Sequence, residues 1–166
     1  MNVIGIDVGA KGSLVHLKNG ELIKQFEFNK SSIKEYKNYL LSLDSKPIIS
    51  VEQVASMRGQ GVKSMFSFGT RFGEIIGMLE TLDLEYNLIK PKEWQKKILK
   101  YDYLIDIEYQ DIKEKIAHII MCLYYGKFNI NLDLLKTNLR SKKLFKTDKS
   151  DAIAIAMASC INLYDI

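Results

Sequence analysis

The first part of the chain alternates between short apolar runs and residues that favour turns. An apolar run at 2–8 is followed by two glycines within 9–12, which predicts a buried strand and then a turn. Residues 13–19 and 21–28 flank Asn19-Gly20, a dipeptide typical of tight β-hairpins. We expect these three strands to form an antiparallel meander.

Helical periodicity follows the meander and is interrupted by two more strand-like runs, at 47–54 and 84–89. Helices are predicted over residues 32–43, 62–82, 92–99, 109–125 and 150–163, and an irregular segment over 126–147. Ser31 or Ser32 can cap the first helix, and Pro91 fits the first position of the third. Helical crossovers between later strands predict an α/β fold, with a mixed five-stranded sheet, part antiparallel meander and part parallel strands, flanked by helices.

Composition places few limits on this fold. The 166 residues contain no internal repeat and only two prolines, so a single domain spanning 1–166 is expected. No run reaches the roughly 18 apolar residues of a membrane span. The chain opens directly with a strand, and neither Cys122 nor Cys160 belongs to a C-x-x-C unit. A cytoplasmic protein, with both cysteines as buried apolar residues in a reducing compartment, is the expectation.

Positive charge is concentrated rather than spread evenly. The net charge is +4, and one segment, 136–149, holds six basic residues against a single acid. These basic residues are Lys136, Arg140, Lys142, Lys143, Lys146 and Lys149. Such a run is typical of contacts with nucleic-acid phosphates, although a solvated surface loop has the same composition.

Four acidic residues stand out by position. Asp7 and Glu52 end two of the strand-like runs, while Asp148 and Asp151 lie near the start of the last helix, on one face. Each alone could be a helix cap or an ion-pair partner. Together, carboxylates repel one another unless a cation lies between them. Oxygen-only ligands suit Mg²⁺, with Mn²⁺ as a substitute.

Other metal chemistry has less support. His16 and His118 are far from each other and from any cysteine pair, so no zinc spacing exists, and a structural or surface role is expected for both. Four carboxylates with Mg²⁺ suggest phosphoryl chemistry in a two-metal arrangement. In that arrangement one ion activates water and the other stabilises the leaving oxygen.

Three segments together resemble a known family. Gly-Ile-Asp-Val-Gly around Asp7, Val-Glu-Gln-Val around Glu52, and Asp-Lys-Ser-Asp-Ala-Ile-Ala-Ile-Ala from Asp148 resemble the RuvC-type Holliday junction resolvases, of the RNase H-like (retroviral-integrase-like) superfamily. The similarity covers nearly the whole chain. It implies a homodimeric, Mg²⁺-dependent endonuclease that nicks two opposed strands of a four-way DNA junction. It also implies that Asp7, Glu52, Asp148 and Asp151 are the metal ligands.

The resemblance extends to two helices. Residues 66–73 are similar to the start of the long helix that packs at the family's dimer interface, and 91–97 to a stretch that carries lysines near the scissile phosphate. The small residues Gly69, Gly73 and Gly77 form a stripe on the long helix, which could build a two-fold interface with Met65, Phe72, Ile76 and Leu79. Trp94, at helical spacing from Ile98, is expected in the core.

One departure concerns the junction centre. Bacterial RuvC has an aromatic residue directly after Glu-Gln-Val, and this chain has Ala55 there. Met57, Phe66 or Phe68 could serve instead, although core packing is favoured for both phenylalanines. The loop from Arg58 is more similar to phage-type relatives.

Candidate DNA contacts outside the acidic residues come from three segments. They are Arg58, Gln60 and Lys63; Lys92, Lys96 and Lys97; and Arg140, Lys142, Lys143, Lys146 and Lys149. The alternative for the first two groups is an exposed loop and the solvent face of an amphipathic helix.

Three other functions remain open from the residues. A broader branched-DNA nuclease acting on flaps or forks would use the same acids. A sugar-kinase-like or actin-like nucleotide-binding protein shares the opening motif, but such proteins need a longer chain and further phosphate loops. A binding module without catalysis is disfavoured because all four acids are present.

Overall fold

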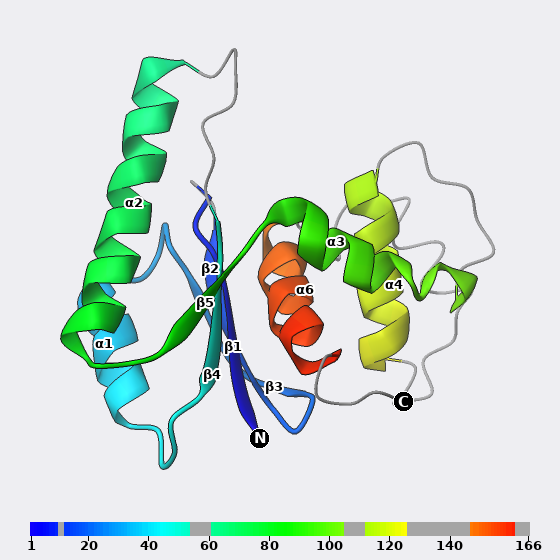
Figure 1. The fold of residues 1–166 in the computed structure, drawn as a ribbon, viewed down its shortest axis with the longest axis horizontal. Helices are drawn as coiled ribbons and strands as arrows, with labels where there is room; N and C mark the ends of the chain where they lie inside the picture. Colours follow the sequence, from blue (N-terminus) through cyan, green and yellow to red (C-terminus); the bar gives the residue numbers. More distant parts are fainter. Residues whose placement is uncertain (10–11, 54–60, 105–111, 126–146, 162–166) are drawn as a thin grey trace.

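The computed structural model describes residues 1–9, 12–53, 61–104, 112–125 and 147–161 (Figure 1). The strands are β1 (Asn2–Asp7), β2 (Ser13–Lys18), β3 (Glu21–Glu27), β4 (Ile48–Glu52) and β5 (Tyr86–Ile89). They form one sheet in the order β3-β2-β1-β4-β5. The pairs β1–β2 and β2–β3 are antiparallel, whereas β1–β4 and β4–β5 are parallel. The predicted mixed five-stranded sheet is confirmed.

Helices cover both faces of this sheet. They are α1 (Ile33–Leu41), α2 (Val62–Thr81), α3 (Pro91–Leu99), the short 3-10 helix η1 (Asp102–Leu104), α4 (Ile112–Tyr125) and α6 (Thr147–Ile161). In Figure 1, α1 and α2 lie on one side of the strands, and α3, α4 and α6 on the other. None of the described helices is long and apolar enough to cross a membrane.

Local sequence explains the first hairpin and the first helix. Asn19 and Gly20 both have positive φ, 53° and 84°, which is the backbone that a two-residue hairpin turn requires. Ser32 caps α1: its hydroxyl accepts a hydrogen bond from the Glu35 backbone, and the Glu35 carboxylate accepts one from the Ser32 backbone. This reciprocal capping box stabilises the start of the helix.

The two faces of the sheet pack differently. On the α1/α2 face, large side chains fill the space, including Ile4, Phe26 and Tyr36. On the α6 face, the helix contributes a row of buried small residues, including Ala152 and Ala156, against β1. A Cβ on Gly5 would overlap the carbonyl oxygen of Ala152 and lie 2.5 Å from the backbone nitrogen of Ala156. The helix backbone therefore approaches the central strand more closely than any side chain at Gly5 would permit.

Several expected details change. The last helix begins at Thr147, three residues before the predicted start, because Thr147 to Ser150 already have helical backbone. A register shift between His16 and Leu17 interrupts the β2–β3 pairing, and the sequence pattern did not predict it. Both histidines are buried, consistent with structural roles. Cys122 is half-buried, with burial raising the pKa of its thiol, and Cys160 lies outside the described side chains.

Candidate functional site

Asp7 and Glu52 come together because their strands are parallel neighbours. The register pairs Ile6 with Val51, and each acid is the next residue along its strand. Side chains alternate between faces of a sheet, so Asp7 shares the face of Gly5, and Glu52 that of Ser50. Both of these preceding residues lie against α6. The two carboxylates therefore stand at one edge of the sheet, on its α6 face.

Two contacts fix this face of the sheet to α6. Gly5 lies against the backbone of Ala152 and Ala156, as described above, and the hydroxyl oxygens of Ser50 and Ser159 are 2.6 Å apart. Asp151 directly precedes Ala152 and is 7% exposed, as is Asp7. The start of α6 therefore brings Asp151 to the end of β1 that carries Asp7. Asp148 lies one turn earlier in the helix backbone, and its side chain is outside the described residues.

The acidic residues differ in their surroundings. Asp7 accepts a hydrogen bond from the backbone N–H of Gly9, at 2.9 Å, across the turn that follows β1. Glu52 is half-buried, and its Oε1 accepts a hydrogen bond from the indole Nε1 of Trp94, at 3.1 Å. Trp94 is 1% exposed, which confirms the core prediction, yet its hydrogen bond to Glu52 was not expected. The signal available was chemical: a buried indole N–H needs an acceptor.

The donor set is of the right kind for a hard divalent cation. Asp7, Glu52 and Asp151 offer carboxylate oxygens only, which suits Mg²⁺ or Mn²⁺ rather than zinc. Among the described side chains, which exclude that of Asp148, no three acid, histidine or cysteine groups are close enough to hold an ion. The residues therefore fit the group in the chemistry of their oxygen donors, and the side chain of Asp148, the fourth acid of the predicted set, lies outside the described ones.

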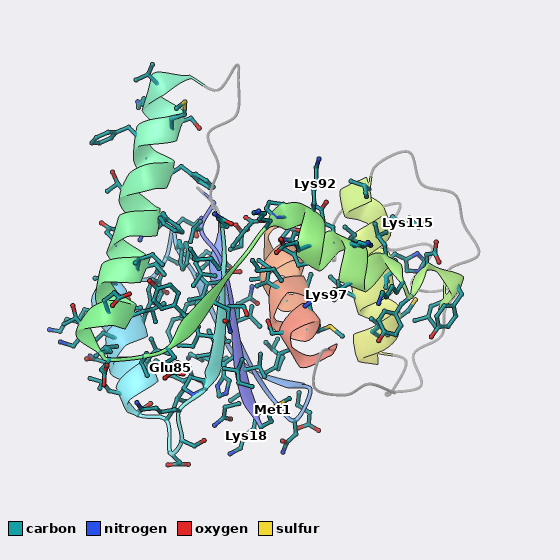
Figure 2. All side chains as sticks on the ribbon, in the orientation of Figure 1. Met1, Lys18, Glu85, Lys92, Lys97 and Lys115 are labelled. Carbon is teal, nitrogen blue, oxygen red and sulfur yellow. The ribbon has the colours of Figure 1, made fainter. Side chains whose placement is uncertain are left out.

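The predicted lysine contacts fall into two groups. Lys63, Lys92 and Lys96 are exposed, and Figure 2 shows Lys92 projecting away from α3. Lys97 is half-buried and donates a hydrogen bond to the Ala158 carbonyl of α6, at 3.2 Å, so its amino group has a structural partner. The remaining predicted contacts lie outside the described residues or side chains: Arg58, Gln60, Arg140, Lys142, Lys143, Lys146 and Lys149.

The first half of α2 is exposed. A Cβ added at Gly69, Gly73 or Gly77 would meet nothing within 4 Å, so no described element approaches this stripe. Phe66 is 76% exposed, and the expectation of core packing was wrong for it because the buried residues of α2 all lie in its second half.

Other residues of α2 divide between this exposed surface and the core. Phe68 is half-buried and packs against the core, as predicted. Met65 is exposed, whereas Leu79 is fully buried within the chain and cannot belong to a surface interface.

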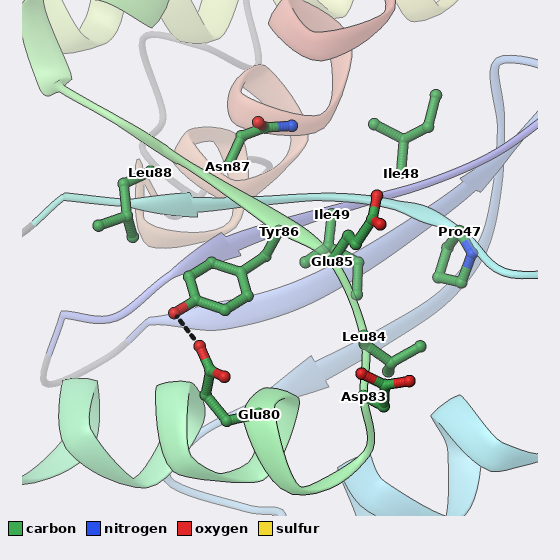
Figure 3. Close-up of a pocket in the computed structure, with 10 residues that line it drawn as sticks. All are labelled: Pro47, Ile48, Ile49, Glu80, Asp83, Leu84, Glu85, Tyr86, Asn87 and Leu88. Atoms are coloured by element: carbon green, nitrogen blue, oxygen red, sulfur yellow. Dashed lines mark hydrogen bonds between the residues drawn. The ribbon is translucent and has the colours of Figure 1, made fainter.

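A separate groove lies along the edge strand β5, away from the carboxylates. Figure 3 shows its lining residues, which include Glu80, Asp83 and Glu85. The hydroxyl of Tyr86 donates a hydrogen bond to the Glu80 carboxylate, at 2.7 Å. Three acids on this rim make it an unfavourable surface for a polyanion.

Comparison with known proteins finds similarity in structure but not in sequence. No protein-family model and no curated protein matches the chain. The RuvC of Thermus thermophilus, solved in complex with a Holliday junction substrate, superimposes with a TM-score of 0.62 at 14% identity, covering 98% of this chain and 94% of that one. A second Thermus thermophilus RuvC structure gives a TM-score of 0.55 at 14% identity, covering 98% and 95%.

The chain has the RuvC fold. The match spans nearly the whole of both proteins, so the RNase H-like architecture predicted from the three acidic segments is confirmed. At 14% identity the likeness concerns the fold.

Proposed function

We propose that the chain is a Holliday junction resolvase, a structure-selective, Mg²⁺-dependent endonuclease that makes paired symmetric nicks in four-way DNA junctions. The observation that carries this proposal is the placement of Asp7 and Glu52 on the face of a RuvC-fold sheet against which the start of α6, with Asp151, packs. Its place of action would be the cytoplasm of a bacterial or phage-infected cell, in recombination, repair or phage DNA processing.

Asp7, Glu52, Asp148 and Asp151 would hold the metal. When bound, Mg²⁺ supplies activation of water and stabilisation of the leaving oxygen in phosphodiester hydrolysis. The protein's part is to orient the carboxylates. The backbone of Gly9 fixes one Asp7 oxygen, and the packing of α6 on Gly5 sets the distance of Asp151 from β1.

Exposed lysines near Glu52 would contact the DNA backbone. Lys92 and Lys96 lie on α3, the helix that carries Trp94, and so they stand near the carboxylate edge. A lysine binds phosphate as a point charge and contributes to affinity without reading sequence. Lys63, with Arg58 and Gln60, and the basic residues Arg140, Lys142, Lys143, Lys146 and Lys149 would extend this surface.

A homodimer is part of the proposal, because two opposed nicks require two active sites. The first half of α2, with the exposed Phe66 and the open Gly69–Gly73–Gly77 stripe, provides a surface that a second copy could cover. We expect Phe66→Ser to shift the chain toward monomer in sedimentation velocity at micromolar concentration. The matched control is Tyr103→Ser, which also removes an exposed aromatic side chain. A buried residue such as Phe28 would not be a suitable control. A wild-type chain that sediments only as monomer would contradict the dimer.

The proposed nuclease activity is tested by removing the charge of one predicted metal ligand. Asp7→Asn keeps the shape of the side chain and is expected to lower Mg²⁺-dependent cleavage of a four-way junction by at least about a hundredfold, while junction binding persists. Asp83→Asn is the matched control, since Asp83 is exposed and lies beside the β5 groove. Full cleavage by Asp7→Asn would overturn the assignment.

The substrate is tested on a panel at equal salt, because binding to DNA changes steeply with salt. We expect the four-way junction to be cleaved faster than a replication fork, a flap or an RNA–DNA hybrid. Faster cleavage of the flap or fork would favour the broader branched-DNA nuclease over the resolvase.

A further inference from the structure

Helix α3 reaches the carboxylate edge through a single buried side chain. Trp94 lies in the core between α3, α6 and the sheet, in the cluster that contains Ile98 and Ala154. Its one polar atom, Nε1, donates to Oε1 of Glu52, 42 positions earlier in the sequence. The N–H of a buried indole is thus hydrogen-bonded to the carboxylate of the last residue of β4.

A second contact holds the same helix against α6. Lys97 is one turn after Trp94 and donates to the carbonyl oxygen of Ala158. The last carbonyls of a helix have no partner within it, and a cation there is favourable. Figure 2 places Lys97 between α3 and α6. Helix α3 is therefore anchored at two points, and Trp94 is not free to follow Glu52 if that side chain turns away.

We propose that Trp94 is a positioning residue, whose indole N–H holds the Glu52 carboxylate in the orientation that binds the catalytic divalent cation. This inference rests on the proposed function. A glutamate has three side-chain torsions, and fixing them before the ion arrives removes an ordering cost from metal binding. Removing a group that hydrogen-bonds to a metal ligand, and so orients it, typically lowers metal affinity or activity about 10- to 100-fold.

The alternative is that Trp94 only fills the core. The two roles separate because an isostere can keep the ring and lose the donor. Trp94 is the chain's one tryptophan, so growth of a tryptophan auxotroph on β-(3-benzothienyl)alanine, in which sulfur replaces Nε1–H, changes this residue alone. Trp94→Phe is the second, genetically encoded variant. Ile98→Val is the matched control, because Ile98 is fully buried on the same helix and its loss of one methyl group leaves the indole N–H in place.

The first readout is metal binding without DNA, measured as free Mn²⁺ by electron paramagnetic resonance. We expect the sulfur isostere and Trp94→Phe to bind Mn²⁺ about 10- to 100-fold more weakly than wild type, and Ile98→Val to match wild type. A parallel fall in kcat for junction cleavage, with KM for the junction unchanged, is expected. Equal Mn²⁺ affinity and equal kcat in the isostere and wild type would overturn the inference and leave the nuclease intact.

The second readout uses the tryptophan itself. Metal binding next to its hydrogen-bond acceptor is expected to shift the emission of wild-type Trp94 as Mg²⁺ is added, and Glu52→Gln is expected to remove that response. A response that persists in Glu52→Gln, or its absence in wild type, would count against the inference. If the emission and Mn²⁺ results are as expected but no junction is cleaved, the proposed substrate fails while the role of Trp94 stands.

Discussion

The two faces of the sheet are built from alternate residues of the same strands, yet they use opposite packing strategies. On the α1/α2 face, Ile4, Ile6 and Phe26 separate the helices from the strands by full side chains. On the other face, Gly5 and the alanines of α6 let the two backbones nearly touch. Only the second face carries the predicted acids Asp7 and Glu52 at its edge.

This difference shows how acids on a strand and acids on a helix can be brought to the same part of the molecule. Side chains of Asp are short, so acids on a helix and on a strand can share an ion only if the two backbones are close. Bulky packing stabilises a face through apolar burial, and it also holds the backbones apart. On the α6 face, Gly5 has no side chain to bury, and the helix backbone therefore approaches the central strand closely.

Among the substitutions that test this contrast between the two faces, one at Gly5 is expected to change stability the most. In Gly5→Ala, the new Cβ overlaps Ala152 and forces the helix away, so we expect the free energy of unfolding to fall by about 3 kcal/mol or more. Urea unfolding monitored by circular dichroism provides the measurement. Junction cleavage at a temperature where the variant is folded should also fall, because Asp151 moves with Ala152.

The matched change on the opposite face is Gly73→Ala. Beyond the nearby backbone of α2 itself, no described atom lies within 4 Å of that Cβ, so at concentrations where the chain is monomeric the helix should gain about 0.5–1 kcal/mol. If both substitutions cost the same, the contrast between the faces is wrong.

A smaller effect is expected at the start of α1. Ser32→Ala removes the side-chain half of the capping box and should lower the free energy of unfolding by about 1 kcal/mol. Ser31→Ala is the control, since the hydrogen bonds of Ser31 use its backbone: the carbonyl accepts from the Tyr36 hydroxyl and the N–H donates to the Glu27 carbonyl. Because α1 lies far from the acids, cleavage at low temperature should be unchanged in both variants. A loss of cleavage in Ser32→Ala would show that the two faces are coupled.

The smallest effect should appear as a pH dependence of stability at His16. Nδ1 accepts from the Tyr39 hydroxyl at 2.7 Å, and Nε2–H donates to Asn2 at 3.1 Å, so the neutral ring satisfies both partners. Burial, and then the charge of Lys18, lower the pKa of His16 below its ordinary 6.5. The unfolded chain therefore takes up the proton first. The stability that this neutral ring contributes is complete above about pH 6.5 and declines as the pH falls through and below that value.

Urea unfolding at a series of pH values, compared between wild type and His16→Gln, checks this sign. The variant should lose part of the decline between about pH 7 and pH 5.5, where most carboxylates are still ionised. An identical pH profile in both proteins would show that His16 is not the group responsible.

Much of the fold is local enough to be predicted. Asn19-Gly20 can adopt the positive φ angles of its turn regardless of the rest of the chain, and Ser32 finds its partner three residues away. The mixture of antiparallel and parallel pairing also follows from the hairpin and the helical crossovers. What could not be predicted depends on distant residues. The exposure of Phe66 and the burial of Leu79 are set by how far α2 extends past the sheet, which its own periodicity does not encode.

The candidate site divides in the same way. Positions of Asp7 and Glu52 at strand ends were evident from the apolar runs before them, and parallel pairing then brings them together. The contact between Trp94 and Glu52 joins two segments that share no pattern, and neither residue alone indicates the other. Lys97 was expected to contact DNA, and only the position of α6 reveals Ala158 as its partner. Its predicted contact with DNA stays a prediction.

The pairing of Gly5 with Ala152 also bears on the order in which the protein forms during synthesis. The ribosome releases β1 long before the helix that covers it, whereas β2 and β3 can close their hairpin as soon as they emerge. Contacts between distant segments form late because a long loop must be closed first. We expect the nascent chain to expose the central strand until α6 arrives, and the acidic edge to be the last part assembled. Under the proposed function, a partly made chain would then lack the carboxylate cluster that cleavage requires.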